Sequence, residues 1–264
     1  MDKKTTTFGL ALSGGGHKGL AHAGCLQFLN EQQIYPKIIS GTSAGAIVGS
    51  LYANGKKPKE ILSFFKSINL FRWSHLSFRK AGFLDANQFA KYLSEEFGTK
   101  YIKDLEVELY ISATEIERGK LKIFHRNTPI IQAVLASSAF PGVFSPVEID
   151  GKTYSDGGIL NNYPVNTIQG RCDFLIGSNV NPLLTQKPVQ FSSIKSVAFR
   201  AFEIMMMQNT FPQNELCDWH IQAEELANYN IFETSKKRMD EIFDIGYEET
   251  KRQFEQIKEK HFLL

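Results

Sequence analysis

Three short glycine-containing segments carry residues that could do chemistry together. They are Gly14-Gly15-Gly16-His17-Lys18-Gly19, Gly41-Thr42-Ser43-Ala44-Gly45 and Asp156-Gly157-Gly158. In this order they supply backbone N–H groups that can bind an anion, a serine hydroxyl, and a carboxylate that could act as a base. Each segment alone is a weak signal, but together they contain the parts that an acyl-transfer site requires.

The segment around Ser43 has the pattern G-x-S-x-G and lies between a predicted buried strand, 37–40, and a predicted helix, 43–54. A sharp turn between strand and helix would lift the serine hydroxyl clear of the sheet, as in a nucleophile elbow. Gly41 and Gly45 would permit such a strained turn and a close contact between strand and helix. The competing interpretation is a serine that only caps the helix, since serine is favoured at that position.

Three consecutive glycines, Gly14 to Gly16, follow a predicted buried strand at 8–12 and precede a predicted helix. Without side chains in the way, their N–H groups can converge on one anion. In acyl transfer this anion is the tetrahedral oxyanion, and the loss of one donor raises the barrier by about 3 kcal/mol. We therefore expect this loop to bind the oxyanion, with Lys18 beside it in a structural role.

The same loop also fits the dinucleotide-binding pattern G-x-G-x-x-G. A site of that kind places an acidic residue at the end of the second strand, where it binds the ribose. Here the second predicted strand ends in Ile38-Ile39-Ser40 and runs into the turn of Ser43. The sequence therefore argues against a bound dinucleotide.

Asp156 is the candidate base for the serine. It follows a predicted strand, 152–155, and precedes Gly157 and Gly158. A carboxylate at a strand end that is followed by glycines can closely approach the end of a neighbouring strand. The competing interpretation is an ordinary turn aspartate, because Asp-Gly pairs are common in turns.

A histidine could instead act between the serine and an acid. His220 follows Asp156 in the chain and would give the order Ser–Asp–His of α/β-hydrolases. It lies in Cys217-Asp-Trp-His220, where the sequence shows no recognisable strand followed by a loop. A Ser–Asp–His esterase therefore remains an alternative to a Ser–Asp dyad.

The composition fits an ordinary globular protein and argues against several functional classes. The 264 residues carry a net charge of +2, which is too small to indicate nucleic-acid binding. Three cysteines without metal-ligand spacing predict a reducing, cytoplasmic compartment and no metal site. We find no signal peptide and no apolar run of about 18 residues, so any membrane contact would be peripheral. The sequence gives no indication of the oligomeric state.

The order of the predicted elements indicates an α/β fold. A strand, a turn and a helix occur twice in succession near the N-terminus, which predicts a parallel sheet. Asp150-Gly151 predicts a hairpin turn between two later strands. We expect a single domain, 1–264, with core motifs in 8–180 and a helical C-terminal section at about 190–264.

Taken in order, the three glycine motifs resemble those of the patatin-like phospholipase family. Residues 136–146 (ASSAFPGVFSP) and 161–165 (NNYPV) are also similar to segments that flank the aspartate in that family. The resemblance covers about residues 8–180. It implies a three-layer α/β/α sandwich around a mostly parallel sheet. It also implies a hydrolase that cleaves acyl esters of lipids without a metal or another cofactor.

The resemblance further implies a role for each motif residue. Ser43 corresponds to the nucleophile and Asp156 to its base, with no histidine between them, and the reaction would pass through an acyl-enzyme. The oxyanion loop corresponds to Gly14, Gly15 and Gly16, and the supporting positions are Lys18, Gly19, Gly41, Gly45, Gly157 and Gly158. The expected substrates are phospholipids, lysophospholipids or related lipids.

An acyl chain also needs an apolar pocket. The candidate ranges are 58–71, 83–97 and 202–211, the last with three consecutive methionines, which adapt to irregular apolar surfaces. The alternative to an enzyme is a lipid-binding or regulatory module, whose intact site would rarely turn over.

Overall fold

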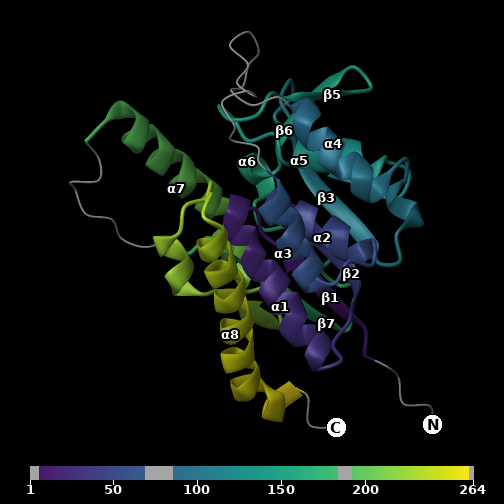
Figure 1. Ribbon diagram of the computed structural model, residues 1–264, viewed down its shortest axis with the longest axis vertical. Helices are drawn as coiled ribbons and strands as arrows, with labels where there is room; N and C mark the ends of the chain where they lie inside the picture. The colour runs from purple at the N-terminus through teal and green to yellow at the C-terminus, as the bar shows by residue number, and fades with distance from the viewer. Residues whose placement is uncertain (1–5, 69–85, 184–191, 262–264) are drawn as a thin grey trace.

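The computed structural model describes residues 6–68, 86–183 and 192–261. Within these ranges a central sheet of eight strands is flanked by helices (Figure 1). The predicted α/β/α architecture is confirmed. None of the helices within these ranges combines the length and the apolar character that crossing a membrane requires.

Parallel strands form the centre of the sheet, and antiparallel strands extend it on one side. The strand order is β5-β6-β3-β2-β1-β7-β8, and β4 pairs with β3. From β3 to β8 all neighbours on this path are parallel, whereas β4, β5 and β6 pair antiparallel. The strands are β1 (Phe8–Leu12), β2 (Pro36–Thr42), β3 (Glu108–Glu115), β4 (Lys120–Phe124), β5 (Val147–Ile149), β6 (Lys152–Asp156), β7 (Phe174–Ser178) and β8 (Trp219–Ile221).

Most of the helices pack on the sheet through the apolar residues on one of their faces. The helices α1, α2, α3, α4, α5 and α8 share one large apolar core with one face of the sheet, and α7 packs against α6 (Figure 1). The helices are α1 (Leu20–Glu31), α2 (Ala44–Ala53), α3 (Pro58–Ser67), α4 (Ala86–Phe97), α5 (Ile130–Ser137), α6 (Gly158–Asn161), α7 (Ile194–Asn214) and α8 (Lys236–His261).

The strands supply both cores by alternating their side chains. In β1, Leu10 and Leu12 point into the large core, whereas Ala11 belongs to a smaller core on the opposite face. Tyr163 and Ile168 close this smaller core and are fully buried. The period of two residues along a strand explains this division. Because both faces are covered, the central strands read as continuous apolar runs in the sequence.

The C-terminal helix α8 packs directly on α1 through glycines. A Cβ atom on Gly24 of α1 would lie 2.0 Å from the carbonyl oxygen of Phe243, and one on Gly246 of α8 would lie 2.0 Å from that of Ala21. These distances leave no room for any side chain, so the two helix backbones are in contact. The section after residue 190 is thereby held against the N-terminal part of the fold.

The ends of β2 and β6 lie next to each other along one edge of β3, and this arrangement brings Ser43, which follows β2, close to Asp156. Thr42, the last residue of β2, pairs with Ser112 of β3, and Asp156, the last residue of β6, pairs with the next residue, Ala113. Since β4 occupies the other edge of β3 at these residues, β2 and β6 lie on the same side of it. The strands β2 and β6 therefore run toward each other and end next to each other.

The C-terminal section is not wholly helical, in contrast to our expectation. Residues 219–221 form β8, which pairs parallel with β7 and includes His220. Three residues are too few to show a strand pattern in the sequence. The predicted hairpin is confirmed: β5 pairs antiparallel with β6, and Asp150 and Gly151 have φ of 51° and 70°, as a two-residue hairpin turn requires.

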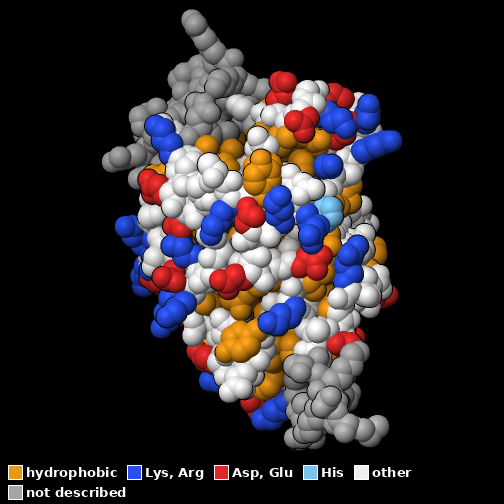
Figure 2. Space-filling model, turned by 90° about the vertical axis from the view of Figure 1, so that its right-hand side faces the viewer, with side chains coloured by type: hydrophobic (Ala, Val, Ile, Leu, Met, Phe, Trp, Pro, Cys, Tyr) orange, Lys and Arg blue, Asp and Glu red, His pale blue; other side chains and the backbone are white. Residues whose placement is uncertain are grey.

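The surface of the molecule carries charges of both signs. On the face shown in Figure 2, Lys and Arg side chains are interspersed with Asp and Glu, and apolar side chains lie between them. Such a mixed surface is usual for a globular protein. It differs from the exposed side of α7, described below.

Candidate active site

Ser43 occupies a strained turn between β2 and α2. Its φ of 51° and ψ of −117° lie in a region that residues with a Cβ rarely adopt, which costs on the order of 1–3 kcal/mol. The N–H of Ser43 donates a hydrogen bond to the Ser137 hydroxyl at 2.8 Å. A Cβ on Gly41 would lie 2.5 Å from the carbonyl oxygen of Gly45, and one on Gly45 would lie 2.3 Å from that of Leu12. Only glycine fits at both positions.

Asp156 is buried at the end of β6, with 2% of its surface exposed. Burial raises its pKa from 3.8 to about 6, although the Ser43 side chain and the N–H of Gly158 lower it in part. Oδ1 accepts a hydrogen bond from this N–H at 2.7 Å. Oδ2 is buried and has no hydrogen-bond partner among the described residues. The Ser43 side chain thus favours the ionised form of the carboxylate, whose Oδ2 keeps an acceptor position open.

The glycine loop presents its three residues differently. The N–H of Gly14 donates to the carbonyl oxygen of Asn162 at 2.9 Å. Gly15 and Gly16 line the cavity beside Ser43, and their N–H groups have no hydrogen-bond partner among the described residues. Gly16 has φ of 57°, and a Cβ on it would lie 2.1 Å from the carbonyl oxygen of Ile231. The two free N–H groups are therefore the ones available to an anion.

The remaining motif residues hold neighbouring elements close together. A Cβ on Gly19 would lie 2.6 Å from the Cβ of Ala44, and one on Gly157 would lie 2.3 Å from the carbonyl oxygen of Ser112. Lys18 is buried at 8% exposure, and burial lowers its pKa, which the nearby carboxylate of Glu203 partly offsets. Lys18 therefore places a positive charge in the wall of the cavity, opposite an acidic residue of α7.

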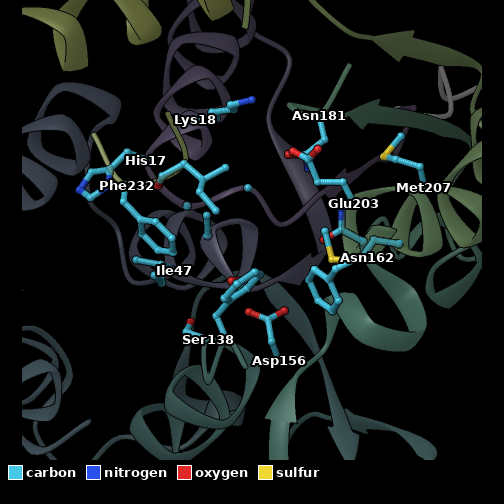
Figure 3. A pocket seen from close by; sticks show the side chains of 18 of the residues that line it. His17, Lys18, Ile47, Ser138, Asp156, Asn162, Asn181, Glu203, Met207 and Phe232 are labelled. Atoms are coloured by element: carbon cyan, nitrogen blue, oxygen red, sulfur yellow. Dashed lines mark hydrogen bonds between the residues drawn. The ribbon is translucent and has the colours of Figure 1, made fainter. Parts of the chain in front are cut away.

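An apolar cavity of about 290 Å³ opens above Ser43 and Asp156. In Figure 3, the carboxylate of Asp156 points into this cavity, with Asn162 and Asn181 to one side and Phe232 to the other. Each predicted acyl-pocket range contributes to the apolar wall, through Phe65, Ile68, Phe89, Phe202, Met206 and Met207. Residues 69–71 and 83–85 of those ranges lie outside the described part of the chain.

The structure also brings polar residues to the site that carried no prediction. Ser137 bonds the N–H of Ser43, Asn162 bonds the N–H of Gly14, and Asn181 donates from its side chain to the carbonyl oxygen of Gly14. Asn181 follows β7, and the carboxyl ends of parallel strands gather at one edge of a sheet. Applying that rule to β7 would have identified Asn181, whereas Ser137 lies in the segment 136–146 that resembles the family but received no predicted role of its own.

His17, His22 and His220 do not lie between Ser43 and Asp156. His220 is in β8, where its Nδ1 lies 3.0 Å from the Tyr163 hydroxyl, and it does not line the cavity. His22 is fully buried behind the glycine loop, and burial lowers its pKa to about 4. His17 lines the cavity, but its Nδ1 lies 3.3 Å from the carbonyl oxygen of Ile231. In the described ranges, no group of three or more His, Cys, Asp or Glu residues could hold a metal ion.

Comparisons with known proteins place these features in a family. A family model described as patatin-like phospholipase matches residues 10–168. Uncharacterized NTE family proteins of Mycobacterium tuberculosis and Mycobacterium bovis are 35% identical over 176 residues. This match covers 65% of the chain and 48% of each relative, so the chain spans about half the length of these relatives. Lysophospholipase NTE1 of Saccharomyces cerevisiae is 28% identical over 193 residues, which are 69% of the chain and 11% of that protein.

Solved structures with low sequence identity share the fold. VipD from Legionella pneumophila superposes with a TM-score of 0.64 at 17% identity, covering 95% of the chain and 67% of VipD. Human GIVD cytosolic phospholipase A2, solved with methyl gamma-linolenyl fluorophosphonate, gives a TM-score of 0.54 at 10% identity, covering 96% of the chain and 58% of that structure. The family match covers more than half of the sequence and contains all three glycine motifs. This chain belongs to the patatin-like phospholipase family.

Proposed function

We propose that this protein is a serine acyl hydrolase that cleaves fatty-acyl esters of lipids with Ser43 as nucleophile and Asp156 as base. The observation that carries the proposal is the meeting of β2 and β6 on consecutive residues of β3, which places both side chains at one end of an apolar cavity. The family and the names of the lysophospholipase relatives support the same class of reaction.

The reaction proceeds in two steps through an acyl-enzyme. Asp156 accepts the proton of the Ser43 hydroxyl as Oγ attacks the ester carbonyl, and the N–H groups of Gly15 and Gly16 hold the resulting oxyanion. The C–O bond to the leaving alcohol then breaks, and Asp156 returns the proton to that alcohol. Water, deprotonated by the same carboxylate, attacks the acyl-enzyme and releases the fatty acid. Gly14 supports the loop rather than the oxyanion, because its N–H is already bonded to Asn162.

The raised pKa of Asp156 suits this role. A carboxylate with a pKa about 6 is still ionised at neutral pH, yet it is a better base for an alcohol than an exposed aspartate. Neutral to mildly alkaline conditions should therefore give full activity.

Single-chain lipids are the substrates that fit this cavity best. Its volume of about 290 Å³ is at the small end for ligand pockets and would accommodate one acyl chain more readily than two. Five relatives of fungal origin carry the name lysophospholipase. We therefore place lysophospholipids first among the candidate substrates, ahead of phospholipids with two acyl chains.

The test is the release of free fatty acid from phosphatidylcholine, lysophosphatidylcholine and a monoacylglycerol. Wild type should release fatty acid, and Ser43→Ala and Asp156→Asn should each lower kcat by about 10³-fold or more while remaining folded by circular dichroism. His220→Ala is the matched control and should retain activity. Release that survives Ser43→Ala would contradict the mechanism. Labelling of Ser43 by a fluorophosphonate without turnover of any ester would favour a lipid-binding or regulatory module.

Peripheral membrane contact through α7 forms part of the proposal. Ile194, Val197, Ile204 and Met205 are exposed by 91%, 50%, 41% and 61%, and they lie on the solvent side of a helix that projects from the molecule (Figure 1). The opposite side of α7 lines the cavity. An exposed face of a helix is normally polar, and an apolar one marks an interaction site. A lipid surface fits because one helix would then contact both the membrane and the acyl chain drawn from it.

Flotation with phosphatidylcholine vesicles tests this contact. Met205→Asp should weaken binding by about 10-fold, which is the order expected when one buried apolar side chain is lost. Leu121→Asp is the matched control, because Leu121 is an exposed apolar residue on β4, away from α7. Equal binding of both variants would contradict a role for α7.

We also propose a cytoplasmic location. The thiols of Cys25, Cys172 and Cys217 are free, which fits a reducing compartment. Fractionation of the native cells would check this, and a pool of the protein in the medium would contradict it.

A further inference from the structure

We propose that Asn181 is a positioning residue that keeps the N–H of Gly15 turned toward Ser43. This inference rests on the proposed function, in which that N–H binds the oxyanion. Asn181 belongs to the loop after β7, outside the segment that matches the family model. It lines the cavity on the side opposite Phe232 (Figure 3).

The peptide group before Gly14 is held at both ends. The Nε2 atom of His22 lies 2.8 Å from the carbonyl oxygen of Ser13. Because a carbonyl oxygen can only accept, Nε2 carries the proton and donates it. Its Nδ1 accepts from the Ser178 hydroxyl at 2.8 Å. The N–H of Gly14, on the other side of the same peptide group, donates to Asn162 at 2.9 Å. This first peptide group cannot rotate without breaking two buried hydrogen bonds.

The next peptide group joins Gly14 to Gly15, and here Asn181 is the holding partner. Its Nδ2 donates to the carbonyl oxygen of Gly14. In a trans peptide group the N–H points opposite to the C=O. Because Asn181 holds the carbonyl on one side, the N–H of Gly15 must point to the other side. The Cβ of Ser43 would lie only 3.2 Å from a Cβ on Gly14, so the loop passes directly beside the nucleophile.

Without Asn181 this orientation would be weakly determined. Glycines adopt positive and negative φ with similar ease, so a peptide group between two of them can rotate at little cost. A rotated group would present its carbonyl oxygen to the oxyanion in place of the N–H, which reverses the electrostatic contribution. The sequence therefore needs a donor from outside the loop to select one of the two orientations.

Asn181 is itself fixed by the strand that the sequence did not predict. Its N–H donates to Oδ1 of Asn179 at 3.1 Å, and Nδ2 of Asn179 donates to Oε1 of Gln222 at 2.8 Å. The N–H of Asn179 donates to the carbonyl oxygen of Ile221 in β8 at 2.9 Å. The loop after β7 is thus tied to β8, and through Asn181 it is tied to the glycine loop.

Kinetics of Asn181→Asp and Asn181→Ala test the inference. The aspartate has nearly the same shape but offers an acceptor where Gly14 needs a donor. We expect kcat to fall about 10²-fold with KM nearly unchanged, as for a misplacement of about 1 Å at a reacting centre. The inhibition constant of a trifluoromethyl ketone lipid analogue, whose adduct with Ser43 carries an oxyanion, should rise by the same factor. A merely structural role would not produce this parallel.

Asn54→Asp is the matched control. Asn54 also donates from Nδ2 to a backbone carbonyl, that of Glu96 at 3.0 Å, but it lies at the end of α2 away from the cavity. Its kcat and inhibition constant should stay at the wild-type values. An unchanged kcat in folded Asn181→Asp, or a loss confined to KM, would overturn the inference.

A crystal structure of Asn181→Asp gives a readout that does not depend on activity. We expect the peptide group between Gly14 and Gly15 to be rotated, with the Gly14 carbonyl facing Ser43. The wild-type orientation retained in that structure would overturn the inference even if activity were lost. If wild type releases fatty acid from no ester, the proposed function fails, and this structure alone still decides whether Asn181 sets the orientation.

Discussion

The two walls of the cavity are built in different ways. The wall that carries Ser43 and Asp156 consists of strand ends and glycine turns, in which backbone atoms contact backbone atoms. The opposite wall consists of side chains from α3, α4 and α7, mainly phenylalanine and methionine. The first wall leaves no room for an added methyl group. The second is filled by flexible or rotatable apolar groups that can be exchanged for one another.

This difference separates the chemistry from the choice of substrate. Backbone geometry sets the positions of the proposed nucleophile, base and oxyanion donors, so these positions tolerate almost no change. Apolar side chains determine the shape of the acyl cavity, and volume-conserving exchanges among them cost little. We therefore expect substitutions in the first wall to affect stability and kcat, and those in the second to affect the preferred acyl chain.

The largest effect is expected for Gly45→Ala. Its new Cβ would meet the backbone of Leu12 at 2.3 Å, and neither element can move without disturbing the sheet, so we expect a loss of about 3 kcal/mol or more in the free energy of unfolding. Gly151→Ala is the control, because Gly151 has φ of 70° but open space around it, which predicts a loss of roughly 1 kcal/mol. Urea unfolding measures both. Equal losses would show that the first wall is not fixed by backbone contact.

A second effect concerns pH and Asp156. The carboxyl group ionises near 3.8 when unfolded and about 6 when folded, so the unfolded state loses its proton first as pH rises. Stability should therefore fall between about pH 4 and pH 6 and then level off. Asp156→Asn lacks this loss and should be more stable than wild type above pH 6, by up to about 3 kcal/mol. Thermal unfolding at pH 4 and pH 8 checks the difference.

The activity of wild type should show the opposite trend over the same range. Only the ionised carboxylate can accept the serine proton, so kcat/KM should decline below about pH 6, by about 100-fold at pH 4. A profile that stays flat to pH 4 would mean that Asp156 is not the base, or that its burial is relieved in the folded protein.

The smallest effect is expected in the second wall. Phe202 lines the cavity and contacts Phe140 with ring centroids 5.3 Å apart. Phe202→Leu should change the ratio of kcat/KM between eight-carbon and sixteen-carbon acyl esters by about 10-fold, with little effect on the rate at which a fluorophosphonate labels Ser43. Phe211→Leu, on the same helix but exposed, should leave the ratio unchanged. A large loss of labelling in Phe202→Leu would show that the second wall also determines the reactivity of Ser43, in contradiction to the division of roles between the two walls.

The sequence predicted the first wall better than the second. The glycine motifs can be recognised in the sequence because only glycine fits at certain fixed positions of this wall. The contacts that a Cβ would make at Gly41, Gly45 and Gly157 show this. The pairing of Ser43 with Asp156 was predicted from the resemblance of the ordered motifs to the family, because the residues alone left a histidine as an alternative base. Which phenylalanines face the cavity could not be predicted, since core and pocket residues share one composition and only the packing of distant helices distinguishes them.

The supporting hydrogen bonds were predicted least. The hydrogen bonds of Asn181 and Ser137 span 167 and 94 positions of sequence, so no local pattern can reveal these contacts. The strand β8 was missed for a similar reason: it is three residues long and is defined by its neighbour β7. Interactions of this kind depend on the completed sheet.

The carbonyl oxygen of Ile231 fills the space beside Gly16, and its residue also accepts the N–H of His17 at 2.8 Å. We therefore expect residues 10–168, the segment that matches the family model, not to work as an excised fragment, because its glycine loop rests on a residue more than sixty positions later. In chimeras between relatives, a crossover near residue 180 would transfer α7, β8 and α8 as one block. Such a block would carry over the part of the acyl wall that α7 contributes together with the support of the loop, while α3, α4 and the turn of Ser43 stay unchanged.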